Sequence, residues 1–252
     1  MSKPVSKPLR PRPGSGALGG SLVHLDTVDS TNDHARALVR EGAPNGSVVV
    51  AEEQTAGRGR QGRTWTAPRD SALMLSVLWE LDELLGLATA VAVCEACEGT
   101  TVISCRIKWP NDVWVGDRKV AGILIEARPQ ERWAVIGIGL NVDTSEHQFE
   151  PQLRQTATSL RIESGARVDR DRALDALLAS LAKWFGELGE QRAGVLDAYR
   201  RRDALNGRPI SWADGSRSGT AQGIDDNGNL IVFSDDDERL TLSAGEVHLQ
   251  VD

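Results

Sequence analysis

Helical periodicity disappears from the sequence after Asn206-Gly207, and this change constrains the fold more than any other feature. Residues 207–252 instead carry the turn signals ADGS and DDNGN. These turns separate the short runs RPISW, GTAQGI, NLIVF and RLTL. Short runs at close spacing, with turn residues between them, predict antiparallel strands. We therefore expect a small antiparallel β barrel or sandwich over residues 206–252, separate from a larger domain over residues 21–205.

The larger domain is predicted to mix strands and helices. Short apolar runs bounded by turn residues predict buried strands, whereas apolar residues three or four positions apart predict helices. Pro110 interrupts one short strand, and the turn around Gly116 joins the two strands of a hairpin. The predicted strands are residues 22–26, 47–53, 72–79, 120–125 and 133–142; the predicted helices are residues 84–98, 171–188 and 195–205, with a shorter one beginning after an N-cap at Ser30 or Thr31. The order indicates an α+β (mixed α/β) fold.

The charge balance argues against one class of function. The chain has 36 acidic and 29 basic residues, and its formal net charge is -7. Nucleic-acid binding needs a basic face, so we expect no DNA partner, and the three arginines within residues 56–65 are expected to form a local site. No apolar run approaches the roughly 18 residues of a membrane span, so we expect no membrane partner.

The first twenty residues are rich in Pro, Gly and Ser and lack the apolar stretch of a secretory signal. Residues 1–20 are therefore predicted to be a disordered tail. Cys94, Cys97 and Cys105 form an odd set that is typical of a reducing compartment, which predicts a cytoplasmic protein. The CxxC of Cys94 and Cys97 lies in a helical run, where a buried apolar role is favoured over a redox or zinc site.

The segment AGRGRQGRTW, residues 56–65, matches the dinucleotide-binding pattern G-x-G-x-x-G in its letters but not in its context. That pattern needs a helix opening at its last glycine, whereas Pro68 and a stretch without helical periodicity follow here. Glycines let the backbone approach a ligand closely, and Arg58, Arg60 and Arg63 offer forked donors for carboxylate and phosphate oxygens. The segment predicts a loop that wraps a small anion. A nonspecific RNA-binding loop or a merely solvated loop is the alternative.

A second polar cluster lies in KWPND, residues 108–112, and in KVAGIL, residues 119–124. Charged side chains this close to buried strand residues are costly unless they are paired or used. In the alternative interpretation, Asn111 and Asp112 cap a turn and Lys119 is a solvated hairpin residue. Neither motif by itself decides between these interpretations.

The motifs DSTND, AEEQTAGRGRQGR-W, KWPNDVWVGDRKVAGILIE and IGIGLN, taken together in this order, resemble the biotin protein ligase family from about residue 22 to the C-terminus. The resemblance implies a class II aminoacyl-tRNA synthetase-like catalytic domain followed by an SH3-like β barrel. It implies an enzyme that uses ATP, with Mg2+ on the triphosphate, to convert biotin into biotinyl-5'-AMP and pyrophosphate. Biotin is then transferred to one lysine of the biotin carboxyl carrier domain of an acyl-CoA carboxylase.

The resemblance also assigns roles to particular residues. Lys119 matches the lysine that contacts the biotin carboxylate and later the acyl phosphate, so Lys119 and Arg58 are expected to act electrostatically in catalysis. Asp112 is hypothesised to orient or deprotonate the acceptor lysine, which is mostly protonated at neutral pH. The expected biotin-binding residues are Ser30, Thr31, Asn32, Gln54, Arg58, Gly59, Arg60, Lys119 and Gly122. The expected ATP- or adenylate-binding residues are Arg60, Arg63, Trp65, Asn111, Lys119 and Asn141, and the metal ligands are not indicated.

Two other functions fit parts of the pattern. A lipoate ligase shares the implied fold but not the GRGRxGR loop, and a biotin sensor without catalysis would not need Lys119. Gln61 stands where some family members carry a further arginine, which removes one possible phosphate contact. Members that also act as repressors carry an N-terminal winged helix-turn-helix, for which the first twenty residues leave no room, so a ligase without repressor function is expected. A homodimer could form through an exposed sheet edge, although no residue marks such an edge.

Overall fold

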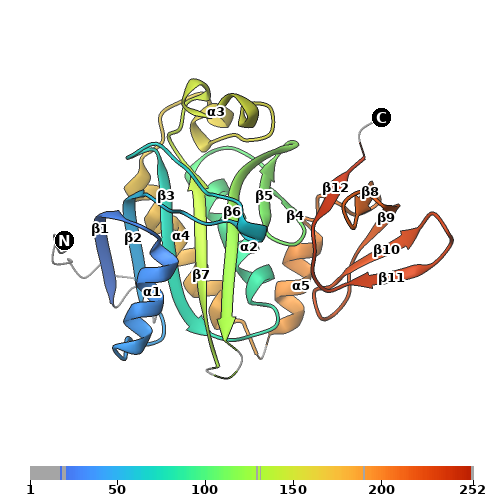
Figure 1. Ribbon diagram of the computed structural model, residues 1–252, viewed down its shortest axis with the longest axis horizontal. Helices are drawn as coiled ribbons and strands as arrows, with labels where there is room; N and C mark the ends of the chain where they lie inside the picture. The colour runs from blue at the N-terminus through green and yellow to red at the C-terminus, as the bar shows by residue number, and fades with distance from the viewer. Residues whose placement is uncertain (1–17, 19–20, 129, 131, 190, 251–252) are drawn as a thin grey trace.

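A computed structural model describes residues 18, 21–128, 130, 132–189 and 191–250, and these residues form two sheets (Figure 1). The first sheet contains β1 (Leu22–Val28), β2 (Val48–Gln54), β3 (Ala72–Glu80), β4 (Arg106–Lys108), β5 (Asp112–Val115), β6 (Arg118–Arg128) and β7 (Trp133–Asn141). The second contains β8 (Pro209–Trp212), β9 (Arg217–Ile224), β10 (Leu230–Ser234), β11 (Arg239–Leu242) and β12 (Val247–Leu249). The helices are α1 (Thr31–Arg40), α2 (Leu85–Thr100), α3 (Leu160–Ser164), α4 (Arg170–Gly186) and α5 (Arg192–Arg200), with short 3-10 turns that include η1 (Arg60–Gly62).

The first sheet has the strand order β1-β2-β3-β7-β6-β5-β4. β1 and β2 are parallel, and the other neighbouring strands are antiparallel. The predicted hairpin is confirmed, because β5 and β6 pair on either side of the turn at Gly116. β7 lies beside β6, as its apolar run predicted. The sheet is therefore mixed, and most of its pairing is antiparallel.

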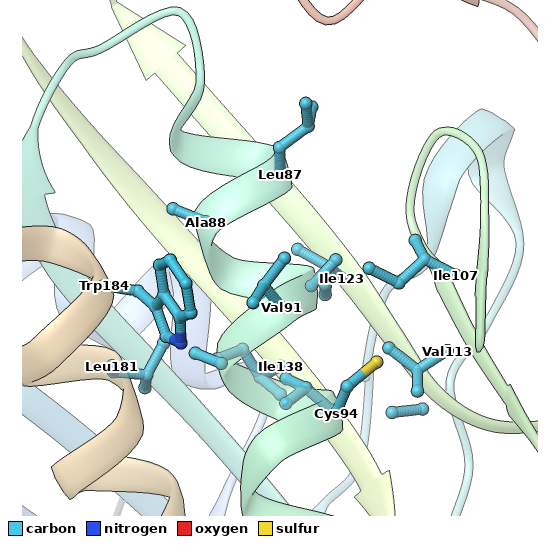
Figure 2. Close-up of a cluster of buried hydrophobic side chains, with 14 of the residues drawn as sticks. Leu87, Ala88, Val91, Cys94, Ile107, Val113, Ile123, Ile138, Leu181 and Trp184 are labelled. Carbon is cyan, nitrogen blue, oxygen red and sulfur yellow. The ribbon is translucent and has the colours of Figure 1, made fainter. Parts of the chain in front are cut away.

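Three helices, α2, α4 and α5, form a layer on one face of this sheet (Figure 1). α2 lies between α4 and α5 and packs on β4, β5 and β6, whereas α4 packs on β3 (Figure 1). The apolar residues of α2 are spread around the whole helix, as is typical of a helix buried on several sides. Figure 2 shows the core that results, in which Val91 and Cys94 of α2 gather with Ile123 of β6, Ile138 of β7 and Trp184 of α4. This layer supports the sheet from behind and leaves its other face for a site.

The other face of the sheet is covered in part by α1. This helix packs on β2, β3 and β7, and its Ala35 joins Leu25, Val49, Leu78 and Val135 in a second, smaller core. Beside α1, the loop that carries η1 crosses in front of the central strands (Figure 1). The part of this sheet face between α1 and the edge strand β4 is thus covered by a loop instead of a helix.

The second sheet has the order β11-β10-β9-β8-β12, with antiparallel pairing throughout, which confirms the strands predicted from the short apolar runs. Its Ile210 and Leu230 belong to the same hydrophobic cluster as α2. At the junction, Trp109 Nε1 donates a hydrogen bond of 3.1 Å to the carbonyl oxygen of Gly228. The two sheets therefore share a continuous packed core.

One predicted helix ends earlier than its pattern indicated. The prediction extended it over residues 195–205, whereas α5 stops at Arg200. Beyond it, the Ile107 backbone N–H donates to the Arg202 carbonyl (2.7 Å), and the Ala204 N–H donates to the Ile107 carbonyl (2.9 Å). These bonds pair residues 202–204 with the edge strand β4, so pairing with the sheet replaces the last turn of the helix. The prediction for residues 201–205 was wrong because local periodicity carries no information about that edge.

Most of the predicted disordered tail, residues 1–20, lies outside the described residues. Leu18 is described, and its side chain is fully buried in the larger core. Cys94, Cys97 and Cys105 are free and buried, as the apolar interpretation predicted for the first two. Within the described part of the chain, no helix is both long and apolar enough to cross a membrane.

Candidate active site

The floor of the candidate site is a patch of the sheet that is built from glycines and therefore carries few side chains. Directly paired residues of antiparallel strands share a face, and successive residues alternate between faces. Gly122 of β6 pairs with Gly139 of β7, and Leu124 pairs with Gly137 two positions further on the same face. A Cβ at Gly137 would lie 2.4 Å from Asn32 Oδ1 of α1, so this is the face that α1 covers in part. The glycines leave a hollow next to α1.

Trp65 lies in this hollow. A Cβ placed on Gly139 would lie 2.3 Å from the Trp65 ring, and one on Gly122 would lie 3.2 Å from it. The Trp65 backbone N–H donates to the Gly57 carbonyl (3.0 Å), which closes the arginine-glycine loop on itself. The ring Nε1 of Trp65 is buried, and no described residue accepts a hydrogen bond from it. The indole is therefore part of the floor, and its Nε1 is a buried donor without an acceptor among the described residues.

The arginine-glycine loop does not open a helix. Gln61 has φ 53° and Gly62 has φ 73°, so the tip of the loop is a left-handed turn, and Arg63 is extended. Without a helix at its last glycine, the loop has no helix N-terminus to direct at a pyrophosphate. The rejection of the dinucleotide-binding interpretation is confirmed.

The floor, α1 and the loop enclose a cavity of about 270 Å³. The structure brings all of the site residues predicted from the sequence to its walls, although they come from segments far apart in the chain. These residues are Ser30, Thr31, Asn32, Gln54, Arg58, Gly59, Arg60, Arg63, Trp65, Asn111, Asp112, Lys119, Gly122 and Asn141. The motifs singled out in the sequence therefore form one site.

The end of the cavity near α1 carries uncharged polar groups. The backbone N–H and the hydroxyl of Thr31 both donate to Gln54 Oε1, at 2.8 and 3.0 Å. Ser76 of β3 is fully buried, and its hydroxyl donates to Asn32 Oδ1 at 2.6 Å. Ser30 is the N-cap of α1, but its side chain makes no capping hydrogen bond. This end suits a ligand with neutral donors and acceptors.

Arg58 is held at the edge of the cavity by two carboxylates. Its Nη2 lies 2.9 Å from Asp33 Oδ1 and 2.9 Å from Glu126 Oε2. Glu126 also accepts a hydrogen bond of 2.7 Å from Asn32 Nδ2. These contacts connect the start of the arginine-glycine loop with α1 and with the end of β6. In this arrangement the charge of Arg58 is already compensated.

A β-bulge turns Lys119 into the cavity. Lys119 precedes Gly122 by three residues, so a regular strand would place the two on opposite faces of the sheet. The pairing of β5 with β6 shifts between Val113 and Trp114, and the extra residue in β6 reverses the direction of Lys119. A Cβ on Gly122 would therefore lie 2.9 Å from Lys119 Nζ.

Lys119 and Asp112 form an ion pair on the cavity floor. Lys119 Nζ lies 2.7 Å from Asp112 Oδ1, in a close contact that lacks hydrogen-bond alignment. The Lys119 ammonium also lies 5.8 Å from the centre of the Trp65 ring. Asn111 donates from Nδ2 to the Ile123 carbonyl (3.1 Å), which ties KWPND to β6. The interpretation of Lys119 as a solvated hairpin residue was wrong, because its ammonium is paired inside the cavity.

Arg60 and Arg63 connect the loop with the second sheet. Arg60 donates to Asn111 Oδ1 (3.0 Å) and to the carbonyl oxygen of Gly245 (3.2 Å), and burial lowers the pKa of its guanidinium. Arg63 Nη2 lies 2.5 Å from Glu246 Oε1, just before β12. The segment at residues 245–246 therefore closes one side of the cavity.

The contact between Glu246 and Arg63 predicts a small effect of pH on stability. Burial raises the pKa of Glu246, but the hydrogen bond and charge of Arg63 outweigh it and hold the pKa below the usual 4.5. A lowered pKa stabilises the fold above pH 4.5, and this contribution is lost as the pH falls through the lowered value. We expect Glu246→Gln to reduce the free energy of unfolding at pH 7 by about 0.2–1 kcal/mol, and by less at pH 3.5.

Urea unfolding of the wild type and of Glu246→Gln at both pH values measures this difference. Glu41→Gln is the control, since it removes the same charge at the exposed end of α1. An equal loss of stability at pH 7 and pH 3.5 would contradict the assignment to the Arg63 ion pair.

Asn141 lies at the end of β7, where its buried side chain donates from Nδ2 to the Thr158 carbonyl (3.0 Å). Several other residues of the cavity or its supporting network were not predicted from the sequence. They are Ser76, Lys108, Glu126, Gly137, Gly139 and Glu246. One signal was available for two of them, because glycines at alternate positions in IGIGLN leave one face of a strand without side chains.

Comparisons with known proteins identify the class of ligase first. Residues 25–143 match the model described as the biotin/lipoate A/B protein ligase family. Residues 210–249 match the model described as the biotin protein ligase C terminal domain. Most of each sheet therefore lies within a stretch that matches a ligase model.

Individual relatives narrow this class from biotin and lipoate ligases to biotin ligases. The chain is 34% identical to the biotin--[acetyl-CoA-carboxylase] ligase of Paracoccus denitrificans, over 82% of this chain and 92% of that protein. It is 32% identical to the bifunctional ligase/repressor BirA of Bacillus spizizenii, over 90% of this chain and 74% of that protein. The structure of the biotin protein ligase from Aquifex aeolicus in complex with biotin and ATP is similar, with 26% sequence identity and a TM-score of 0.80. The match covers 92% of this chain and 99% of that one. The chain belongs to the biotin protein ligase family, and the expected fold class is confirmed.

Proposed function

We propose that this protein is an ATP-dependent biotin-protein ligase that acts on the biotin carboxyl carrier domain of an acyl-CoA carboxylase. The observation that carries the proposal is the polarity of the cavity. Uncharged donors and acceptors lie at the α1 end, around Thr31 and Gln54, and charged side chains lie at the β5 end, around Lys119. Biotin has a neutral ureido ring at one end and a carboxylate at the other. The cavity can therefore receive the ring beside α1 and direct the carboxylate toward Lys119.

In the first step, a carboxylate oxygen of biotin attacks the α-phosphorus of ATP. The bond between the α-phosphorus and the bridging oxygen breaks, and its electron pair leaves with pyrophosphate. Both reactants are anions, so fixed cations lower the barrier most where negative charge builds up. Lys119 is the proposed catalytic residue, since its ammonium lies directly over the floor. Arg60, Arg63, Asn111 and Asn141 are proposed to contact the nucleotide, with Trp65 packed near its adenine.

Arg58, Gly59 and Asn32 are proposed to act at the biotin end. Arg58 is paired with Asp33 and Glu126, so its contribution to catalysis requires that ligand binding release it from these carboxylates. Gly122 contributes by the absence of a side chain, because a Cβ there would meet both Lys119 and Trp65.

In the second step, the carrier lysine attacks the carbonyl carbon of biotinyl-5'-AMP, and AMP leaves. Asp112 is proposed to orient this lysine or to accept its proton. The ion pair with Lys119 supports this proposal, because it holds the Asp112 carboxylate beside the proposed catalytic lysine. This position is consistent with either role.

Asp112→Asn is expected to slow the transfer of biotin from preformed biotinyl-5'-AMP by about 10²-fold, because a general base typically contributes 10²–10⁴-fold. The measurement is the initial rate of carrier biotinylation at pH 7 and pH 9. Higher pH should restore part of the lost rate, since more of the acceptor lysine is then deprotonated. Transfer at the wild-type rate would exclude this role for Asp112.

Mg2+ is proposed to enter with the triphosphate of ATP, where it would neutralise negative charge. The described residues contain no group of three His, Cys, Asp or Glu side chains arranged to hold a metal ion. We therefore assign no protein ligands to it.

The remaining assignments are proposals of the same kind. The division into a catalytic part, residues 21–205, and a barrel, residues 206–252, is supported by the two sheets on either side of this boundary. A cytoplasmic location is supported by the free, buried cysteines. A homodimer through a sheet edge, and the absence of DNA binding, stay predictions.

Biotin-dependent release of pyrophosphate from ATP tests the central proposal. We expect release with biotin and none with lipoate at equal concentration, followed by labelling of a carrier domain. Release with lipoate alone would favour a lipoate ligase. Folded protein that binds biotin but releases no pyrophosphate, and that retains an operator DNA fragment at physiological salt, would favour a sensor.

A further inference from the structure

Lys108 differs from Arg63 and Lys119, the two cations at the charged end of the cavity that pair with a carboxylate. Arg60 also lacks a carboxylate partner among the described residues, but its guanidinium is hydrogen-bonded to Asn111. Arg63 pairs with Glu246 at 2.5 Å and Lys119 pairs with Asp112 at 2.7 Å. Among the described residues, Lys108 makes no ion pair within 4.0 Å. Its ammonium instead lies 5.3 Å from the centre of the Trp114 ring. It therefore contributes a positive charge to the cavity without a carboxylate that compensates it directly.

The strand pairing directs Lys108 into the cavity. Lys108 of β4 is opposite Asp112 of β5, and Asp112 is opposite Gly122 of β6. Gly122 is in turn opposite Gly139 of β7. Since paired residues share a face, the four form one row across the floor, and Lys108 closes the row at the edge next to the second sheet.

The free charge of Lys108 is held at a cost in free energy. Burial lowers the pKa of its ammonium, and nearby Lys119 and Arg63 act in the same direction, whereas Asp112 and Glu246 oppose the shift. A partly buried cation among other cations is stabilised when an anion occupies the space between them. The geometry therefore indicates that an anionic ligand group belongs at this end of the cavity.

The position of Lys108 indicates which anion this is. The uncharged end of the cavity, at Thr31 and Gln54, lies on the same face of the sheet but toward the edge opposite β4, beside α1. Lys119 lies on β6, between that end and β4. If the biotin carboxylate reaches Lys119, the anion beyond it is the part of ATP that departs from the reacting phosphorus.

We propose that Lys108 binds the β- and γ-phosphate oxygens of ATP and stabilises pyrophosphate as it leaves, a role that rests on the proposed ligase function. When the α-phosphorus bonds to the biotin oxygen, the bond to the bridging oxygen breaks and that electron pair adds negative charge to pyrophosphate. The Lys108 ammonium faces this growing charge and transfers no proton in the step. Lys119 acts on the carboxylate side of the same phosphorus, so the two lysines act on opposite sides of the reaction.

Lys108→Met tests the proposal, because methionine retains the length of the side chain and its contact with the Trp114 ring while removing the charge. We expect the KM for ATP and the inhibition constant of pyrophosphate each to rise at least about tenfold, the effect of losing one charge-assisted hydrogen bond. Biotin affinity measured without nucleotide should not change. Transfer from preformed biotinyl-5'-AMP should not change either, since that step involves no pyrophosphate.

Lys183→Met is the matched control, because the Lys183 ammonium of α4 also lies beside a tryptophan, 4.4 Å from the centre of the Trp184 ring. The Lys183 side chain is half exposed, and the residue belongs to none of the segments that line the cavity. Lys183→Met should leave the KM for ATP, the inhibition constant of pyrophosphate and the biotin affinity unchanged. Lys108→Arg keeps the charge and should remain within a few-fold of the wild type, which separates the loss of charge from misfolding. An unchanged KM for ATP in Lys108→Met, or an equal loss of biotin affinity, would overturn the role of Lys108. Absence of biotin-dependent pyrophosphate release from the wild type would overturn the ligase function itself.

Discussion

Lys119→Met is expected to lower the rate of biotin-dependent pyrophosphate release at saturating substrates by about 10²–10³-fold, the typical effect of removing one charge-stabilising group. The ammonium of Lys119 is brought over the glycine floor by the bulge in β6, where a carboxylate and a phosphate must meet. Methionine occupies similar space without the charge, so biotin should still bind. Stopped-flow detection of pyrophosphate gives the rate, and calorimetric titration with biotin alone gives the affinity.

The ion pair with Asp112 requires a second variant. Lys119→Met leaves the Asp112 carboxylate without its close counterion, which could by itself disturb the site. The double variant Lys119→Met with Asp112→Asn removes both charges and should be equally slow in the first step. Lys183→Met should retain the wild-type rate. A single variant at Lys119 that keeps more than about a tenth of the wild-type rate would exclude it as the main electrostatic catalyst.

Gly139→Ala is expected to weaken the binding of biotinyl-5'-AMP by about 10–100-fold, although only one methyl group is added. The new Cβ would lie 2.3 Å from the Trp65 ring, a separation that side chains do not tolerate. Either the indole leaves the floor or the strand moves, and overpacking of this kind costs about 1–3 kcal/mol. Because Trp65 ends the arginine-glycine loop, its displacement would also move the arginines. Tryptophan fluorescence and the thermal midpoint should both change.

Gly99→Ala is the matched control for this substitution. Gly99 lies in α2 with no atom within 4 Å of an added Cβ, and alanine favours a helix over glycine by about 1 kcal/mol. It should bind biotinyl-5'-AMP normally and melt at an equal or higher temperature. If Gly139→Ala behaved in the same way as Gly99→Ala, the close packing of Trp65 on the floor could not be needed for binding.

Much of the site was predictable because its residues belong to short motifs with distinctive chemistry. Three arginines among three glycines required an anion, and Pro68 after the loop excluded a helix that would bind it in the dinucleotide manner. The strands that flank the loop were predicted within two residues of their ends, since each is a short apolar run bounded by turn residues. Local sequence is enough to predict a strand or a loop when residues within that segment determine its conformation.

Other features depended on contacts that no motif contains. Arg58 was predicted to face the ligand, but Asp33 and Glu126 compensate its charge, and Glu126 lies 68 positions away in the chain. Residues 201–205 continued the helical pattern of α5, but the open edge of β4 takes their backbone groups. In both cases a segment far away in the chain forms an ion pair or a hydrogen bond with the group, and this contact outweighs the local preference.

The amino-acid sequence by itself determined the family, the two kinds of sheet and the set of residues that meet in the cavity. Only the tertiary structure decided the directions in which these side chains point. Lys119 and Gly122 are three residues apart, a spacing that places them on opposite faces of any regular strand, and the bulge against β5 brings them to the same face. Lys108 gains its importance from strand pairing that places it at the end of the row formed with Asp112, Gly122 and Gly139. Register and bulges are set by packing between strands, which is why neighbouring letters in the sequence cannot specify them.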